Sequence, residues 1–563
     1  MKDNNDMTLD YAGKRYRAVA PDTLDLAERA ALAVNGLGGT IDPELGYLPF
    51  GIIHFSDKRP HMQHWASADI TCNPKYGQSL PLMRLVSGSA RYADEERGNR
   101  AGMVARVQDG LYWDTFDPAR PWRNVYGDSE TRYGKGRDED FCVVGAAGLM
   151  LRAVLTWREL SNDPRLDALA RDLAAGMRRV AVMRDDYAYY PEKGGWCEPC
   201  TYPRSGWLNT DEPQSETDGA EGGITCYQAN QIYAAAQWYA ISGDTQALDL
   251  AARLTRFCLK PKFWGGVPDP DLQHARDRHL PGHVAAGLPD PACTAGDELG
   301  HWYSHFHARA LTLRGLLEYG RVTGDERVLE FVRRSYEFTL TQGIARMGWI
   351  NCYPCATNLC EGCSLGDQVA LGVRLSDAGL GDYWDNVDAV VRNHLVEQQL
   401  IRADQLEAIA AACGEDNCRK TLMPRQGCWD NVIARGLGTF GGCSQPDSLP
   451  NPWVMLCCTG NGARGLYYAW ESIVRENGDK AEVNLLLNRA ARLLDIESHL
   501  PYEGKVVIRN KAARRVSVRI PFWMDRTKLR ADVSGKEAAL DWVGNRILFA
   551  GLQARDVLTL TFP

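Results

Sequence analysis

The sequence lacks any long apolar run, because no segment approaches the roughly 18–20 uninterrupted apolar residues of a membrane-spanning helix. It also lacks blocks of like charge, and its net charge is only −8, from 64 basic and 72 acidic residues. A small, evenly spread negative charge argues against nucleic acid or an anionic membrane surface as a partner. The polar beginning, MKDNNDMTLDYAGKRYR, has no apolar stretch of the kind that a secretory signal requires, so we expect a cytoplasmic protein.

Cysteine, by contrast, is abundant, with 17 residues among 563. Disulfides are rare in a reducing compartment, so clustered thiols indicate a metal rather than a disulfide framework. The adjacent Cys457 and Cys458 are poorly placed to be oxidised to each other, because neighbouring Cα atoms lie ~3.8 Å apart and an unstrained disulfide needs roughly 4.4–6.8 Å. These two thiols therefore pack, bind a ligand or react. Four more cysteines lie in NCYPCATNLCEGC, residues 351–363, and two lie in WCEPC, residues 196–200, which we interpret as a loop clamp or a weak second metal site.

Three stretches share one plan, in which an apolar pattern of helical period is followed by a short turn and a second such pattern. Their turns contain Asn162–Asp163, Gly243–Asp244 and Gly324–Asp325, at equal spacing. Glycine suits the left-handed residue that ends a helix, and Asp suits the N-cap of the next helix. Further copies around Gly88 and Asp382 bring the hairpins to about five, which predicts an α-helical toroid.

The pattern changes near residue 478, after which AEVNLLLN, KVVIRN, RRVSVRIPFW and DVLTLTFP predict short strands separated by turns. We therefore predict two domains: a mainly α catalytic domain over residues 1–476 and a β-sandwich domain over residues 477–563. The β-domain is expected to brace the toroid.

Several motifs in the second half of the chain resemble those of one enzyme family. They are EGC at 361–363, CCTGNGAR at 457–464, YWDNVDAVVRNHL at 383–395, and the strand segments VNLLLN, PYEGKVVI and RVSVRIPFW. With them the chain resembles the glycoside hydrolase family 127 β-L-arabinofuranosidases, from roughly residue 300 to the end. The resemblance implies an (α/α)6 barrel followed by a β-sandwich, and a retaining exo-glycosidase. It also implies a zinc ion held by Glu361, Cys363, Cys457 and Cys458, with Cys457 as the nucleophile.

The proton donor departs from the family pattern. The family places a Glu about sixteen residues before Glu361, whereas position 345 is Ala in this chain. Glu298, in the long insert before His305, is the leading replacement, and Glu216, Asp218 and Glu221 are further candidates. For the sugar we expect an aromatic and polar cluster, and the candidates are His301, Trp302 and His305.

Other interpretations of the same residues stay open. The thiols could pack without a metal, or the zinc could be purely structural, as four-ligand zinc sites usually are. The toroid could instead carry a carbohydrate lyase or isomerase, or a non-catalytic sugar-binding protein. The expected ligands are Zn²⁺ and a carbohydrate, and a homodimer is one assembly compatible with the sequence.

Overall fold

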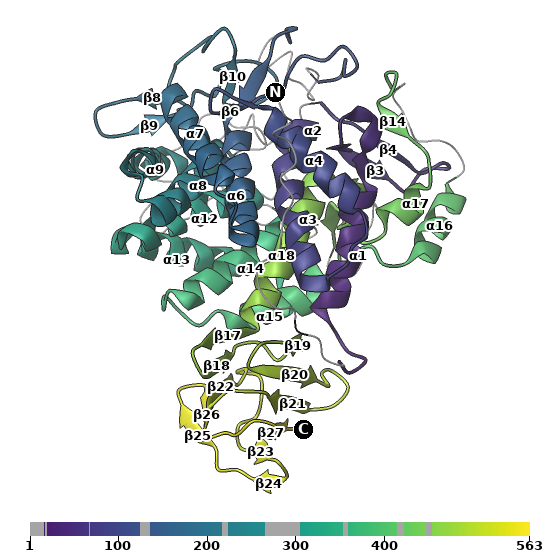
Figure 1. Cartoon of the computed structure of the whole chain (residues 1–563), viewed down its shortest axis with the longest axis vertical. Helices are drawn as coiled ribbons and strands as arrows, with labels where there is room; N and C mark the ends of the chain where they lie inside the picture. The colour runs from purple at the N-terminus through teal and green to yellow at the C-terminus, as the bar shows by residue number, and fades with distance from the viewer. Residues whose placement is uncertain are drawn as a thin grey trace.

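The computed structural model describes residues 16, 20–66, 68–123, 135–214, 216, 223–264, 305–352, 359–413, 422–445 and 453–563. Helices dominate the chain up to Ser472, and strands make up the remainder (Figure 1). The prediction of a mainly α region followed by a β-rich region is therefore confirmed. No described helix has the length and apolar content needed to cross a membrane.

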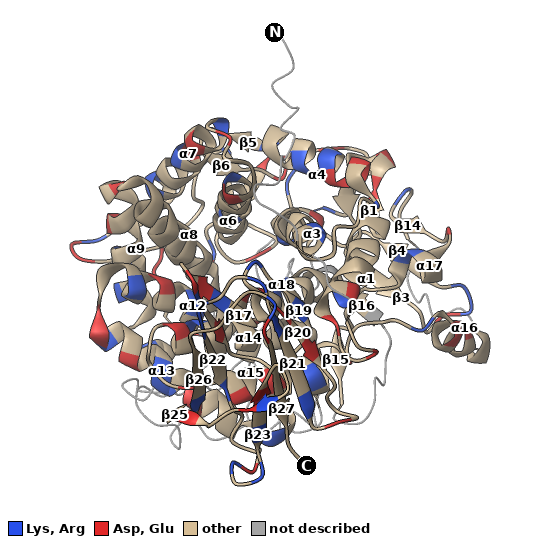
Figure 2. Cartoon of the chain, turned by 60° about the horizontal axis from the view of Figure 1, so that its bottom comes forward, with Lys and Arg blue, Asp and Glu red and all other residues tan. Residues whose placement is uncertain are grey.

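Six of the described helices form a closed ring, in which each contacts the next and the last contacts the first. These inner helices are α3 (Asn73–Ser87), α6 (Val144–Ser161), α8 (Cys226–Ser242), α12 (Phe306–Thr323), α14 (Gly362–Asp377) and α18 (Leu456–Ser472). An outer helix contacts each of them, and Figure 2 shows this second layer around the first. The outer helices are α1 (Leu26–Gly39), α4 (Ala93–Ala105), α7 (Arg165–Val180), α9 (Thr245–Cys258), α13 (Glu326–Thr341) and α15 (Trp384–Val390).

The turns that join inner to outer helices follow the expected chemistry with one exception. Gly243 and Gly324 end α8 and α12 in the left-handed conformation, with φ of 75° and 71°. Asp244 and Asp325 then cap α9 and α13 through their side chains. The turn at Asn162–Asp163 differs, because Pro164 occupies the N-cap of α7. The carboxylate of Asp163 instead accepts the backbone N–H of Arg165.

Short elements occupy the loops. They are α2 (Ala68–Thr71), α16 (Ala403–Ala412), α17 (Val432–Gly436), β1 (Ile41–Asp42), β2 (Leu48–Pro49), β3 (Ile52–His54), β4 (His61–Gln63), β5 (Val107–Gln108), β6 (Leu111–Tyr112), β7 (Phe141–Val143), β8 (Val182–Met183), β9 (Ala188–Tyr189), β10 (Thr201–Pro203), β11 (Gly343–Ile344), β12 (Trp349–Ile350), β13 (Cys360–Glu361), β14 (Gly427–Cys428), β15 (Cys443–Ser444) and β16 (Trp453–Met455). One four-stranded sheet, ordered β14-β4-β3-β16, leads directly into α18.

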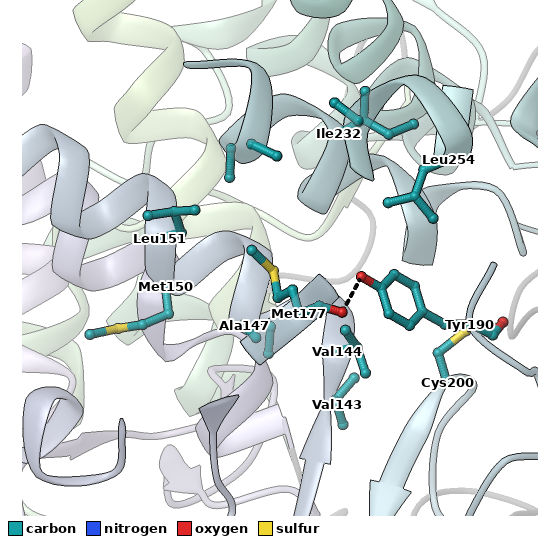
Figure 3. Close-up of a cluster of buried hydrophobic side chains, with 14 of the residues drawn as sticks. Val143, Val144, Ala147, Met150, Leu151, Met177, Tyr190, Cys200, Ile232 and Leu254 are labelled. Atoms are coloured by element: carbon teal, nitrogen blue, oxygen red, sulfur yellow. Dashed lines mark hydrogen bonds between the residues drawn. The ribbon is translucent and has the colours of Figure 1, made fainter. Parts of the chain in front are cut away.

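The WCEPC segment is part of the buried core around α6 to α9 (Figure 3). Tyr190 donates its hydroxyl to the carbonyl oxygen of Met177 at 3.0 Å. The thiol of Cys200 lies beside this ring: it donates to the carbonyl oxygen of Tyr190 at 3.4 Å and accepts from the Gln228 amide at 3.4 Å. Within the described part of the chain, neither Cys197 nor Cys200 joins a group of potential metal ligands. Of the two interpretations of this motif, the contacts support the loop clamp.

The β-rich region consists of two packed sheets. The five-stranded sheet contains β17 (Val474–Asn477), β18 (Lys480–Val483), β22 (Arg515–Arg519), β26 (Arg546–Ala550) and β25 (Asp541–Val543), in that order. The six-stranded sheet contains β19 (Arg489–Ala490), β20 (Leu494–Ser498), β21 (Lys505–Asn510), β27 (Val557–Thr561), β23 (Arg530–Val533) and β24 (Lys536–Glu537). One apolar core joins the sheets to α1, α15 and α18. The predicted boundary after residue 476 falls within β17, and the division into two domains stays a prediction.

Candidate metal centre and active site

The four predicted metal ligands lie at the starts of two neighbouring inner helices. Glu361 is the N-cap of α14 and Cys363 lies in its first turn, while Cys457 and Cys458 lie in the first turn of α18. The cysteine pair lies inside the helix, because α18 begins at Leu456, one residue before Cys457. The N-terminus of a helix carries partial positive charge, which favours thiolate and carboxylate groups there.

Glycines let α14 and α18 approach closely enough for the two pairs to meet. A Cβ on Gly366 would lie 2.3 Å from the carbonyl oxygen of Asn461 in α18. A Cβ on Gly465 would in turn lie 2.9 Å from the Cα of Gly366. Contacts this short exclude any side chain, so Gly366 and Gly465 allow the close packing of α14 against α18.

The ligand atoms of Glu361, Cys363, Cys457 and Cys458 all lie within 4.8 Å of one another. The sulfur of Cys458 lies 3.4 Å from that of Cys363 and 3.9 Å from that of Cys457. A tetrahedral zinc with ~2.3 Å bonds to sulfur separates two sulfurs by about 3.8 Å. Three thiols and one carboxylate at these distances fit a zinc ion.

Burial distinguishes the three thiols. Cys363 and Cys458 are 0% exposed, whereas Cys457 is partly exposed. Burial raises the pKa of Cys363 well above its usual range, so a nearby cation is needed to keep it as a thiolate at neutral pH. Cys457 is thus the one thiol of the three that a substrate could reach.

The carboxyl group of Glu361 remains ionised. Burial alone would raise the pKa of Glu361, but the charge and hydrogen bond of His305 lower it to about 2. His305 is the N-cap of α12, and its Nε2 contacts a carboxylate oxygen of Glu361. The sequence predicted a sugar-binding role for His305, which stays a prediction; the structure shows that the ring lies against a metal ligand.

Cys352 also reaches this carboxylate, with its sulfur 4.0 Å from Oε2 of Glu361. The backbone fixes it there: Cys352 donates its N–H to the carbonyl oxygen of Leu359 and accepts the N–H of Phe306. The expected site did not include Cys352. Its membership of the NCYPCATNLCEGC cluster was the signal available in the sequence.

Lys75 of α3 and Cys72, the N-cap of that helix, also lie near the thiols. Lys75 is buried, with 6% of its surface exposed, in the first turn of α3. Burial alone would lower the pKa of Lys75, but the neighbouring thiols of Cys72, Cys363 and Cys457 raise it. A buried ammonium beside this cluster offsets part of the negative charge of its thiolates.

A buried ionic network lies one helical turn below the thiols. Asp367 of α14 accepts from His307 at 2.6 Å and from Arg314 at 2.6 Å, both on α12. Arg314 also donates to the hydroxyl of Tyr468 on α18 at 2.8 Å. Asn461, also on α18, lies 3.5 Å from Nε2 of His307. The network ties α12, α14 and α18 together beneath the metal ligands.

The proton donor is not located by the described residues. Glu298, His301 and Trp302 lie in the stretch 265–304, outside the described part of the chain. Glu216 is fully buried and paired with Arg309 at 3.1 Å, and that pairing argues against an acid role. The candidates Asp218 and Glu221 also lie outside the described residues.

Ala345, where the family pattern has its Glu, opens a 3₁₀ turn, Ala345–Met347, that contacts the outer helix α15. Cys352, which follows β12 further along the chain, is the residue that lies against Glu361.

No family model and no curated protein matches the sequence. Among solved structures, a family 127 β-arabinofuranosidase matches with a TM-score of 0.55 and 13% identity over 96% of this chain and 76% of that chain. A second glycoside hydrolase matches with a TM-score of 0.52 and 12% identity over 88% and 72%. A family 127 β-L-arabinofuranosidase from Geobacillus stearothermophilus T6 matches with a TM-score of 0.50 and 13% identity over 96% and 76%. The resemblance to glycoside hydrolase family 127 that the motifs indicated is therefore confirmed at the level of the fold.

Proposed function

We propose that this chain is a zinc-dependent retaining glycosidase built on an (α/α)6 barrel, with Cys457 as its nucleophile. One observation carries the proposal: three thiols and a carboxylate from two helix N-termini lie within 4.8 Å of one another. The barrel assignment is supported by the ring of six inner helices, each with an outer partner, among the described residues. The glycosidase assignment is supported by the glycoside hydrolases that share this fold.

Bound zinc would keep the cysteine sulfurs deprotonated at neutral pH. The partial exposure of Cys457 supports its role as the attacking thiol, with Cys363 and Cys458 as buried ligands. In the first step, Sγ of Cys457 bonds to the anomeric carbon as the bond to the leaving oxygen breaks, and an acid protonates that oxygen. In the second step, water bonds to the anomeric carbon, the carbon–sulfur bond breaks, and the same residue takes the water proton. Two inversions retain the anomeric configuration.

The remaining roles stay with the residues that the sequence suggested. Glu298 is the proposed acid and base, and His301, Trp302 and His305 are the proposed sugar contacts. The proposed substrate is a β-L-arabinofuranoside or a similar sugar at a non-reducing end. The cytoplasmic location and a homodimer also stay predictions.

The alternative functions are less well supported. A lyase or isomerase on this toroid would need neither a partly exposed thiol nor its two buried neighbours. A sugar-binding protein with structural zinc would be expected to bury all its ligands, whereas Cys457 is partly exposed.

Turnover of aryl glycosides tests the proposal. We expect the wild-type chain to hydrolyse at least one aryl furanoside in a panel that includes the β-L-arabinofuranoside. NMR of the first sugar released should show that its anomeric configuration is retained. Cys457→Ser should lose activity by at least about 10³-fold, whereas Cys413→Ser, which alters a partly exposed cysteine after α16, should not. Equal activity of Cys457→Ser and wild type would overturn the assignment, and inertness toward every glycoside would favour the sugar-binding protein.

A further inference from the structure

A second group of potential metal ligands shares one residue with the first. His305, Cys352 and Glu361 bring a ring nitrogen, a sulfur and a carboxylate oxygen within 4.8 Å of one another, and all three residues are buried. The function proposed above does not use Cys352, and it gives Glu361 a single role. Glu361, however, has two carboxylate oxygens, and one carboxylate can bind a metal on each side.

The backbone holds the three residues in place before any ligand binds. His305 and Glu361 are the N-caps of the adjacent inner helices α12 and α14. Cys352 is hydrogen-bonded through its backbone to the first residue of α12 on one side and to Leu359, just before β13, on the other. A preorganised set of nitrogen, sulfur and oxygen donors is what a transition metal such as zinc prefers.

A histidine–carboxylate hydrogen bond alone would explain only part of this arrangement. The contact between His305 and Glu361 needs no third partner, yet the thiol of Cys352 lies 4.0 Å from the same carboxylate oxygen, Oε2. A protonated thiol can donate a weak hydrogen bond to that oxygen, so the contact does not itself require a cation. It does place a third potential ligand atom beside the histidine–carboxylate pair.

We propose that the chain binds a second divalent transition metal at His305, Cys352 and Glu361, with Glu361 bridging it to the metal held by Cys363, Cys457 and Cys458. The inference rests on the proposed function for the first metal. Three protein ligands leave a coordination position open, as in catalytic rather than structural zinc sites. Water or a sugar hydroxyl is the group expected there, and the shared ligand Glu361 links this position to the group that contains Cys457. Two-metal sites that share bridging ligands commonly place their ions ~3.5–4 Å apart.

Titration of the metal-free full-length chain with Co²⁺ tests the second site, because cobalt–thiolate absorption reports each binding event. Zinc content of the purified chain gives an independent count. We expect two equivalents per chain in the wild type, and one in both Cys352→Ala and His305→Gln. Cys360→Ala is the matched control, since Cys360 is 0% exposed and adjacent to Glu361 but belongs to neither group, and it should keep two.

The outcomes separate the two proposals. One equivalent in the wild type, unchanged in Cys352→Ala, would overturn the second site and leave the first intact. Two equivalents in the wild type that both persist in Cys352→Ala and His305→Gln would overturn the placement. No bound metal in the wild type would contradict the proposed function as well. Circular dichroism of each variant checks folding. If Cys352→Ala fails to fold, the number of metal equivalents bound by His305→Gln tests the second site.

Discussion

The two ends of α18 serve different purposes. Its first turn carries Cys457 and Cys458 against the start of α14, where anionic ligands converge. After its last residue, Ser472, the chain enters β17 and the β-rich region, where apolar side chains form one continuous core with the helices. A helix of 17 residues is about 25 Å long, so the proposed chemistry and the bracing contacts lie a helix length apart. We therefore predict that the β-rich region acts on stability, and that the site depends on the inner helices and the segments that lead into them.

Removing the β-rich region should have the largest effect. A chain that ends after Ile473 exposes apolar side chains at the helical end of the shared core, among them Val390, Leu395 and Ile473. Each such side chain contributes roughly 1.5–3 kcal/mol when buried. We expect insoluble protein, or a Tm lowered by more than about 10 °C in a thermal melt. A truncated chain that melts like the full chain would show that the bracing role is wrong.

Asp367→Asn tests the network that lies between the two ends. The substitution leaves His307 and Arg314 buried without their carboxylate, which should lower the free energy of unfolding by about 3–5 kcal/mol in urea. Because Asp367 is not a metal ligand, the bound zinc per chain should not change. Asp249→Asn, which breaks partly exposed pairs with Arg178 and Arg253, is the control and should cost about 1 kcal/mol or less. A similar loss in both variants would argue against a special role for the buried network.

Arg519→Ala tests the contact between the β-rich region and the helices. The Arg519 side chain is 2% exposed and pairs with Asp382 at 3.0 Å and with Asp385 at 2.5 Å. Asp382 lies just before α15, and Asp385 lies in its first turn. We expect a loss of about 2–3 kcal/mol, since Asp382 is itself exposed and solvent screens its pair. Zinc content and KM should not change, because the site lies at the other end of α18. A KM shifted tenfold would show that the two ends are coupled.

Loss of the ion pairs of Glu212 with Lys260 and Lys262 should have the smallest effect on stability, and this effect depends on pH. Burial alone would raise the pKa of Glu212, but hydrogen bonds from Lys260 and Lys262 lower it to about 2. Because this pKa lies below the unfolded value of 4.5, the stabilisation is present above pH 4.5 and is lost as the pH falls toward 2. After solvent screening we expect about 1 kcal/mol, measured as the difference in unfolding free energy between wild type and Glu212→Gln. A difference that persists unchanged at pH 2 would contradict the ionic origin.

The sequence predicted those features that depend on local chemistry. The left-handed glycines and the Asp caps around Gly243 and Gly324 define turns regardless of what packs against them. The division into helices and strands followed the apolar period. The four metal ligands were predicted from a motif resemblance, and the structure brings them together, although their role as ligands stays a prediction.

The features that the sequence did not predict depend on closure of the ring. Lys75 and Cys72 belong to α3, and they reach the thiols only because α3 packs against α18. Cys352 and the pair His307–Asp367 likewise meet their partners through contacts between α12 and α14. Apart from the cysteine cluster around Cys352, no local pattern indicates which of many lysines and acidic residues a toroid turns toward its axis. The proton donor is a separate case, because Glu298, Asp218 and Glu221 lie outside the described residues and Glu216 is paired with Arg309.

Trapping the covalent intermediate tests the central claim most directly. A furanoside that forms the thioglycosyl adduct faster than water removes it, or a sugar bearing a haloacetamide, should label one cysteine of the 17. Peptide mass spectrometry should place the label on Cys457, and Cys457→Ser should remain folded but unlabelled. A label on Cys458, on Cys363 or on a carboxylate, with Cys457 unmodified, would contradict the account.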